Sequence, residues 1–410
     1  MFKLNCSVPS LIVLLLLAAC QTPAPQPTVT PPPTTVAPAV VPPLDIVPSV
    51  AEKKSASFKP LNFDAIPGWA DDNLLEAWPA FQASCVALLN KPDWHELCAI
   101  ALSVDEKNNV AIRRFFESFF NPFQVINPDG TDTGLITGYY EPLLHGVRQR
   151  GGRYQTALYR APPDLLTIDM TSEYPELKGM RLRGHVVGSK VLPYPSRADL
   201  AQSESLRGNE ICWVDDSVDA FFLQVQGSGR VQLADSKETI RVAYADQNGH
   251  PYKSIGRYLV DIGELKLEQA SAQGIKNWIV AHPKRESEVL NADPSYVFFK
   301  EEKLIDPNQG PNGALGVALT ERRSIAIDAK YLPLGAPVFI STTQPNSDVP
   351  IKRLMMAQDT GGAIRGAVRA DFFWGFGTHA GEMAGRMKQR GMLWVLWPKL
   401  AAAPPGLISN

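Results

Sequence analysis

The sequence predicts a mainly β protein with flanking helices, preceded by a segment that cannot fold. Short apolar runs separated by turn residues fill residues 125–241, and a second set of such runs fills residues 317–397. Apolar residues at helical spacing precede the first β region and recur between the two, over residues 254–290. A chain of 410 residues is long enough for two or three domains, and its 35 prolines are unevenly spread.

The first twenty residues are typical of a lipoprotein signal. Residues 11–17 form an apolar run of signal-peptide length, too short to cross a membrane as a helix. Residues 17–20 resemble a bacterial lipobox, so we expect a signal peptide over 1–19 and a diacylglycerol on the Cys20 thiol. Gln21 after the cysteine, rather than Asp, favours the outer membrane by resemblance to Gram-negative sorting. The alternatives are an ordinary signal peptide that ends near a cysteine, or a core strand.

A tether follows the predicted lipid site. Residues 20–59 are rich in Pro, Thr, Ala and Val, and such a segment buries too little surface to fold. At about 3.1 Å per residue it reaches on the order of 100 Å when extended. Several acyl chains on one cysteine anchor a protein firmly. We therefore expect a lipid-anchored protein of the outer membrane that faces the periplasm and reaches toward the cell wall.

Charge and cysteine content exclude several classes of protein. A formal net charge of -2 provides no basic footprint for nucleic acid. The 6 histidines are scattered and form no metal-ligand pattern with cysteine, so we expect no metal and no cofactor. An oxidising periplasm allows a Cys85–Cys98 disulfide, but these two residues and Cys212 do not make a disulfide framework.

Residues 60–124 have helical spacing and are expected to be the N-terminal helical part of one domain. Asp71 or Asp72 can cap the first helix. The aromatic stripes could line a groove, but stripes at this spacing usually face a core, and we expect a core. The stripe residues are Leu74, Leu75, Trp78, Phe81, Cys85, Leu88, Trp94, Leu97, Cys98, Ala101, Leu102, Ile112, Phe115, Phe116, Phe119 and Phe120.

Residues 125–253 are expected to form a β domain, with the composition of a small barrel or sandwich. Pro142 holds Glu141 in an extended conformation. The glycines after Gln226 predict a hairpin turn or a close backbone approach to a ligand, and the run lacks the lysine of a phosphate loop. The runs interpreted as β-type are residues 134–142, 183–187 and 220–230.

Residues 254–400 combine helices with a last β region, and residues 401–410 are a tail. One helix passes through Ile255 and another spans 269–280. A loop rich in Gly, Pro and Asn covers residues 306–316. Strands are expected at residues 296–299, 317–320, 324–328, 338–340, 354–357 and 391–397.

Three aspartates stand where these strands are predicted to end: Asp328, Asp359 and Asp371. Asp and Gly favour turns over strand interiors, so such acids can project into a cleft. Asp371 precedes Phe-Phe-Trp, and burial beside aromatic rings penalises the charged form, which predicts a raised pKa. Ordinary Asx-turns followed by core aromatics are the alternative.

The motifs around these acids resemble a known family. The segments that carry the resemblance are residues 327–335, 358–366 and 370–375, together with 138–142, 221–229 and 294–299. From about residue 61 to residue 400 the chain resembles, in order, the three-aspartate-domain lytic transglycosylase family of membrane-bound cell-wall enzymes. The combination of motifs is more specific than any one of them.

The resemblance implies a fold and a reaction. The fold is a six-stranded double-psi β-barrel with flanking helices and an inserted β-rich domain, with a groove between them. The reaction is a lyase-type cleavage, without water, of the β-1,4 bond between N-acetylmuramic acid and N-acetylglucosamine in peptidoglycan. Its product carries a 1,6-anhydromuramic end and belongs to cell-wall remodelling and recycling. Glycan strands, the outer membrane and cell-wall synthase complexes are the implied partners.

The resemblance also implies roles for residues. The muramoyl C6 hydroxyl replaces water, so one carboxyl group can act first as acid and then as base, and by motif match it is Asp371. Asp359 is expected to be its electrostatic partner and Asp328 a weaker, orienting acid. The expected sugar contacts, each with a packing or turn role as alternative, are Tyr139, Glu141, Gln224, Gln226 and the stacking ring of Trp374.

Three other functions fit part of the pattern. One is a non-catalytic peptidoglycan-binding outer-membrane lipoprotein, against which the intact Asp359 and Asp371 argue. A hydrolase with the same site would release reducing muramic ends. A purely structural lipoprotein would not need a Gly-rich acid pocket.

Overall fold

The computed structural model describes residues 55–104, 107–177, 179–304 and 306–408. The predicted signal peptide, Cys20 and the tether up to residue 54 lie outside the described residues. Among the helices described, none combines the length and apolar character that a membrane crossing requires.

Three helices near the start of the described chain confirm the predicted core-facing stripes. Phe81, Trp94 and Phe116, one from each helix, are buried in the main core. A disulfide joins Cys85 to Cys98 and so links the first two helices. The elements are β1 (Ser57–Pro60), a 3-10 turn (Phe63–Ala65), α1 (Trp78–Leu88), α2 (Pro92–Ser103) and α3 (Asn109–Phe119).

The predicted helix cap at Asp71 or Asp72 is wrong, because α1 begins only at Trp78. Asp72 is buried and accepts hydrogen bonds from both terminal nitrogens of Arg323, each at 2.9 Å. It also accepts one from Leu354 N at 2.7 Å. A buried guanidinium needs a hydrogen-bonded counter-charge, and Asp72 provides it. The N-terminal segment is thereby joined to the C-terminal strands.

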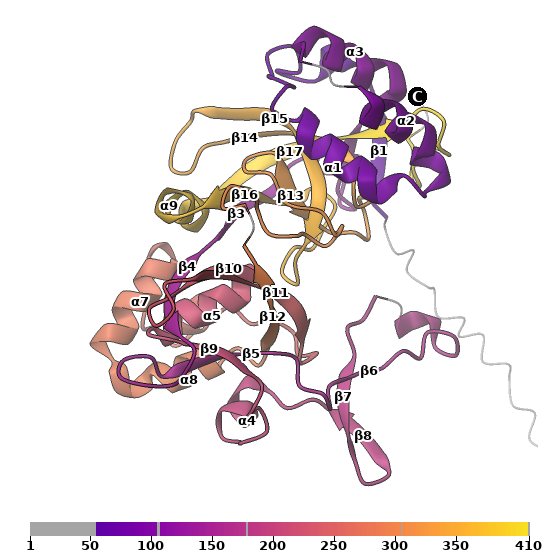
Figure 1. Cartoon of the computed structure of the whole chain (residues 1–410). Coiled ribbons are helices and arrows are strands. Elements are labelled where there is room, and N and C mark those ends of the chain that lie inside the picture. Colours follow the sequence, from indigo (N-terminus) through magenta and orange to yellow (C-terminus); the bar gives the residue numbers. More distant parts are fainter. Residues whose placement is uncertain (1–54, 105–106, 178, 305, 409–410) are drawn as a thin grey trace, which may run out of the picture. The chain divides into compact units, whose positions relative to one another are not determined.

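Six strands close into a barrel, which confirms the predicted architecture. Strand β17 (Lys388–Pro398) pairs with both β14 (Pro337–Thr343) and β3 (Gly134–Glu141), and this double pairing completes the ring. Strands β1 and β2 (Phe120–Ile126) extend the same sheet outward from β17, and α9 (Thr378–Arg386) connects β16 to β17 (Figure 1). The ring runs β3 (Gly134–Glu141), β16 (Arg369–Phe376), β13 (Ser324–Ile327), β15 (Pro350–Thr360), β14 (Pro337–Thr343), β17 (Lys388–Pro398) and back to β3.

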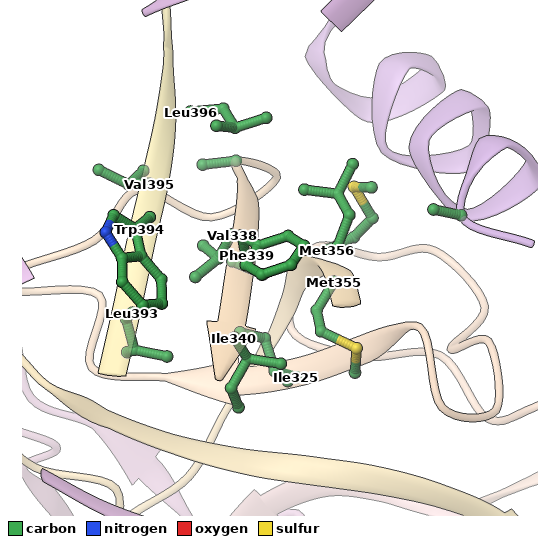
Figure 2. Packing of buried hydrophobic residues seen from close by; sticks show 14 of the residues in the cluster. Ile325, Val338, Phe339, Ile340, Met355, Met356, Leu393, Trp394, Val395 and Leu396 are labelled. Atoms are coloured by element: carbon green, nitrogen blue, oxygen red, sulfur yellow. The ribbon is translucent and has the colours of Figure 1, made fainter. Parts of the chain in front are cut away.

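The barrel strands share one apolar core with the N-terminal helices (Figure 2). Val338, Phe339 and Ile340 are consecutive in β14 and all 0 % exposed, so both faces of this strand are covered. Phe339 packs against Trp69 and Trp394, with ring centroids 5.8 and 6.2 Å apart. Close packing of this kind makes the barrel wall a rigid support for polar groups at its surface.

The inserted domain is a second sheet with its own helices and cores. Its sheet order is β12-β11-β10-β4-β9-β5, and a small separate sheet has the order β6-β7-β8. The strands are β4 (Leu143–Val147), β5 (Thr156–Tyr159), β6 (Leu166–Thr167), β7 (Arg183–Val187), β8 (Lys190–Pro193), β9 (Glu210–Val214), β10 (Ser228–Leu233), β11 (Thr239–Gln247) and β12 (Val297–Lys303). The helices are α4 (Arg197–Ala201), α5 (Ser217–Gln226), α6 (Ile255–Asp261), α7 (Ala272–Ala281) and α8 (Glu286–Asn291), with 3-10 turns at Pro175–Leu177, Leu267–Gln269 and Pro283–Arg285.

The strand pairings differ from the domain limits drawn at residues 125 and 253. β3 pairs with β16 and β17, so it belongs to the barrel and not to the insert. β12 pairs with β11, and Ile255 and Ile275 of α6 and α7 pack with Phe221 of α5, so the helical segment after residue 253 belongs to the insert. Apolar periodicity reveals an element but not its partners in space, which explains the difference.

Residues 317–320, predicted as β, are not a strand, and most of the predicted run 220–230 is helical, with only its last residues in β10. Residues 217–226 form α5, because Asp216 accepts hydrogen bonds from the N–H groups of Val218 and Asp219, both at 2.9 Å. Gly227 ends the helix with φ 86°. These caps outweigh the β preference of the aromatic and β-branched side chains between them. Residues 317–320 form a loop with one isolated bridge, between Asn312 and Ala318.

Candidate active site

Two carboxylates lie on either side of one residue in the barrel wall. Ala326 of β13 pairs with Asp359 of β15, and the same alanine pairs with Asp371 of β16. Asp371 pairs in turn with Thr137 of β3. Directly opposed residues on neighbouring strands point to the same face. Asp359, Ala326, Asp371 and Thr137 therefore form one row across four strands, here called the carboxylate row.

A β-bulge directs Asp359 into the carboxylate row. The register of β13 against β15 shifts by one residue just before Ala326, which leaves Gln358 as the extra residue. Without the shift, strand alternation would put Gln358 in the row and Asp359 on the opposite face. Gln358 is fully buried, and its Nε2 donates to Ala80 O at 2.8 Å and Ser84 Oγ at 2.9 Å. Helix α1 thus fixes the bulge that aims Asp359.

Asp371 is the third residue of β16, so the prediction that it ends a strand is wrong. Its Oδ1 accepts a hydrogen bond from Thr137 Oγ1 at 2.5 Å, and Thr137 Oγ1 accepts one from Arg369 Nη2 at 2.9 Å. Burial raises the pKa of Asp371, while the Thr137 hydrogen bond and the Arg369 charge oppose the rise. Oδ2 makes no hydrogen bond to a described residue, so a ligand can use it.

Asp359 lies one residue before the end of β15, near the strand end where the sequence placed it. Its Oδ1 accepts hydrogen bonds from Thr360 N at 2.9 Å and Ala314 N at 3.0 Å. Burial raises the pKa of Asp359 to about 6 despite these bonds, and the charge of Asp371 adds to the rise.

Tyr139 faces the same site from β3. It pairs with Phe373, and their ring centroids lie 5.1 Å apart. The buried hydroxyl of Tyr139 has no hydrogen-bond partner of ordinary geometry among the described residues. Burial, followed by the charges of Asp359 and Asp371, raises the pKa of Tyr139 well above its usual value. The hydroxyl therefore keeps its proton beside both carboxylates.

Asp328 directly follows β13 and confirms its predicted position at a strand end. Its Oδ1 accepts a hydrogen bond from Lys330 N at 3.2 Å, and its Oδ2 accepts one from Gly366 N at 2.9 Å. Arg365 lies 3.8 Å away. These described partners belong to loops, and Asp328 holds the connection between β15 and β16. Any orienting effect of Asp328 on the site is therefore transmitted through that loop.

Two of the expected sugar contacts are enclosed by protein groups. Glu141 is 0 % exposed and is bound by Arg230 and Arg241. Trp374 is 4 % exposed, belongs to the main core, and its Nε1 donates to Met387 Sδ at 3.2 Å. Strand alternation puts Trp374 on the face opposite to Asp371. We therefore correct the expectation that a sugar contacts Glu141 or stacks on Trp374.

The two glutamines of α5 have different surroundings. Gln224 is 8 % exposed, and its Oε1 accepts from Arg197 Nη2 at 2.9 Å. It lines a cavity of about 650 Å³ in the inserted domain, which contains neither carboxylate. Gln226 is half-buried, and its Oε1 accepts from Tyr140 N at 3.1 Å, beside Tyr139. Gln226 thus stays a candidate near the carboxylate row, and Gln224 does not.

Sequence reasoning missed three groups around the acids: Thr137 and the backbone N–H of Ala314 bond to them, and Arg369 bonds to Thr137. Arg369 lies two residues before Asp371, so strand alternation could have placed both on one face. Thr137 and Ala314 are remote in sequence from the acids that they bind. Only the pairing of β3 with β16 and the course of the 306–322 loop bring them there.

Comparisons with known proteins agree with this architecture. Residues 135–300 match the family model described as the MltA specific insert domain, and residues 323–397 match the 3D domain. The membrane-bound lytic murein transglycosylase A of Escherichia coli K12 is 32 % identical over 281 residues, which is 67 % of this chain and 68 % of the relative.

Solved structures are similar as well. The crystal structure of MltA from Neisseria gonorrhoeae is 38 % identical with a TM-score of 0.74, covering 85 % of this chain and 94 % of that one. The structure of E. coli MltA with bound chitohexaose is 26 % identical with a TM-score of 0.62, covering 84 % and 95 %.

Proposed function

The chain belongs to the membrane-bound lytic murein transglycosylase A family, and on that premise we propose that it cleaves peptidoglycan glycan strands. The bond broken is the β-1,4 link between N-acetylmuramic acid and N-acetylglucosamine, and the product is a 1,6-anhydromuramic end. The observation that carries the proposal is the carboxylate row, in which two acids with raised pKa values flank one alanine.

Asp371 is the proposed acid and base. Its pKa is raised by burial, so it can hold a proton on Oδ2 and give it to the departing N-acetylglucosamine oxygen. The carboxylate so formed takes the proton of the muramoyl C6 hydroxyl as that oxygen bonds to C1. No water enters, and the proton gained at the end replaces the one given at the start. Thr137 holds Oδ1, Arg369 holds the Thr137 hydroxyl, and Oδ2 is left for this exchange.

Asp359 is the proposed electrostatic partner. Its Oδ1 accepts hydrogen bonds from two backbone N–H groups, and these bonds favour the carboxylate, although burial still raises the pKa to about 6. A carboxylate across Ala326 from Asp371 can stabilise an oxocarbenium-like transition state. The Tyr139 hydroxyl keeps its proton and can donate to a sugar oxygen. Gln226 is the remaining candidate contact on the inserted domain.

A solved relative supports glycan binding, since E. coli MltA has been crystallised with chitohexaose. We propose that the corresponding ligand here is the glycan strand of peptidoglycan, in the predicted groove between barrel and insert. We further propose a lipid anchor at Cys20 in the outer membrane, in line with the membrane-bound relatives. Cys20→Ser should move the protein from the membrane to the soluble periplasmic fraction.

Digestion of murein sacculi by the purified protein tests the proposed reaction. Mass spectrometry should detect muropeptides that are lighter by one water than the products of a hydrolase. Reducing muramic ends would assign a hydrolase with the same site. Binding to sacculi without any release would assign the non-catalytic peptidoglycan-binding lipoprotein.

A further inference from the structure

Three buried charged residues lie close to one another outside the carboxylate row. Glu141 ends β3, Arg230 lies in β10, and Arg241 lies in β11. We propose that this triad positions Asp359 by fixing the loop of residues 306–315, whose backbone donates to that carboxylate. The inference rests on the proposed function, because it assigns residues that support the same site.

The triad is closely packed and almost sealed from solvent. Glu141 Oε1 accepts from Arg241 Nε at 2.7 Å, and Glu141 Oε2 accepts from Arg230 Nε at 2.9 Å. The two arginines are 4 % and 6 % exposed. Arg230 also stacks over Phe376, with its Cζ 3.8 Å from the ring centroid. One buried carboxylate faces two guanidinium groups, so further oxygen acceptors are needed to satisfy their N–H groups.

Loop carbonyl oxygens supply these acceptors. Arg230 Nη1 donates to Pro307 O at 2.7 Å, and Arg241 Nη2 donates to Gln309 O. Side-chain donors on a rigid sheet thus hold the backbone of the loop at two points. The second of these carbonyl groups, on Gln309, lies five residues before Ala314 in the chain.

The same loop then contacts β15 at the bulge. Ala314 N donates to Asp359 Oδ1 at 3.0 Å, and Leu315 N donates to Gln358 O at 2.9 Å. Close approach is possible only without a side chain at Gly313, since an added Cβ would lie 2.5 Å from Gln358 O. The path from the triad to the acid therefore runs through backbone groups of a single short segment.

Release of the loop would raise the pKa of Asp359. Loss of the Ala314 N–H removes a bond that lowers the pKa of Asp359, so that pKa rises from about 6. The other groups that face Asp359 are Tyr139 from β3 and Asp371 from β16, and both remain in place. If Asp359 acts as a carboxylate, the acidic limb of activity moves to higher pH. A hydrogen bond to a charged group corresponds to a shift of about one pH unit.

Arg241→Gln in the full-length protein tests the proposal. Its matched control is Arg148→Gln, which breaks an arginine–glutamate pair of the same sheet, to Glu301 at 2.7 Å. We expect the acidic limb of kcat/KM for sacculus digestion to rise by about one pH unit in Arg241→Gln and to stay unchanged in the control. Amide hydrogen exchange at Ala314 should accelerate only in Arg241→Gln.

A second variant tests the contact between the loop and Asp359 without changing the triad. Ala314→Pro removes the N–H at an exposed residue and should reproduce the pH shift with the triad intact. The milder Arg241→Lys replaces Arg241→Gln if the latter does not fold. An unchanged acidic limb and unchanged exchange in the folded Arg241 variant would overturn the inference. A wild-type protein that releases no anhydro product refutes the proposed function instead, and hydrogen exchange still decides whether the triad fixes the loop.

Discussion

Asp359 and Asp371 are separated by a single strand of the barrel, and both pair directly with Ala326. The methyl group between them leaves the two carboxyl groups free to face one ligand. Their surroundings differ, because backbone N–H groups bind Asp359 and a threonine hydroxyl binds Asp371. This asymmetry is the physical basis for assigning them different tasks.

Exchange of each acid for its amide should separate these tasks. Asp371→Asn removes the proposed proton donor and should lower the release of anhydromuropeptides by about 10²–10⁴-fold. Asp359→Asn removes only a negative charge and should lower this release by a smaller factor. Muropeptide release by mass spectrometry and sacculus pull-down give activity and binding, and glycan binding should survive in Asp371→Asn. A larger loss in Asp359→Asn would reverse the assignment.

Thr137→Val should change the pH profile of activity more than it changes the stability of the fold. The Thr137 hydrogen bond lowers the pKa of Asp371, so its loss raises that pKa. Asp371 then stays protonated to higher pH, and the basic limb of kcat/KM moves upward by roughly half to one pH unit. Thr343→Val, which loses a bond from Gln389 Nε2 at 2.7 Å, is a control in the barrel wall. The profile of that control should match the wild type.

Asp359 should weaken the fold at high pH. Its pKa is 3.8 in a solvated chain and about 6 in the fold, so the folded state binds the proton more tightly. Stability therefore falls as the pH rises through this window. Asp359→Asn should be more stable than the wild type by roughly 1–3 kcal/mol at pH 8, with the difference vanishing near pH 3. Urea unfolding at both pH values measures it, and equal stability at pH 8 would contradict the raised pKa.

Asp72→Ala should destabilise the barrel strongly. The side chains of Arg323 and Asp72 are 3 % and 4 % exposed, so the variant leaves an arginine buried without its main partner. Such a loss costs about 3–5 kcal/mol. Asp261→Ala breaks the Arg257–Asp261 pair, whose side chains are 67 % and 54 % exposed, and should cost less than about 1 kcal/mol. Similar losses in chemical denaturation of the two variants would refute the argument.

Reduction of the Cys85–Cys98 disulfide should lower the free energy of unfolding. The bridge closes a loop with a sequence separation of 13 residues, for which chain entropy predicts about 3 kcal/mol. A double variant, Cys85→Ala and Cys98→Ala, should not respond to reductant. Cys212 should resist thiol reagents in the native protein, because burial raises its pKa to about 12.

Motif and periodicity were sufficient for several parts of the molecule. The strands at Ser324–Ile327 and Pro337–Thr343 and the acids at the ends of β13 and β15 are where the sequence places them, and so are the apolar stripes of the first helices except Leu102, which is exposed. These features depend on neighbours in the chain, which a sequence shows directly.

The surroundings of individual side chains could not be predicted from the sequence in the same way. Glu141 and Trp374 are residue types that often contact sugars, yet Glu141 binds two buried arginines and Trp374 packs in the core. Residues 217–226 have β preference, yet caps at both ends make a helix. In each case a partner distant in sequence or a local cap outweighs intrinsic preference.

By itself, the sequence determined which aspartates belong to the candidate site, the order of the helical and β regions, and the family resemblance that implies the reaction. Tertiary structure alone decided which groups surround those acids. The bulge at Gln358 turns Asp359 into the row, β3 brings Thr137 to Asp371, and the triad fixes the loop that binds Asp359. A pKa depends on burial and on charges within a few ångströms, and those distances exist only after residues far apart in the chain have paired.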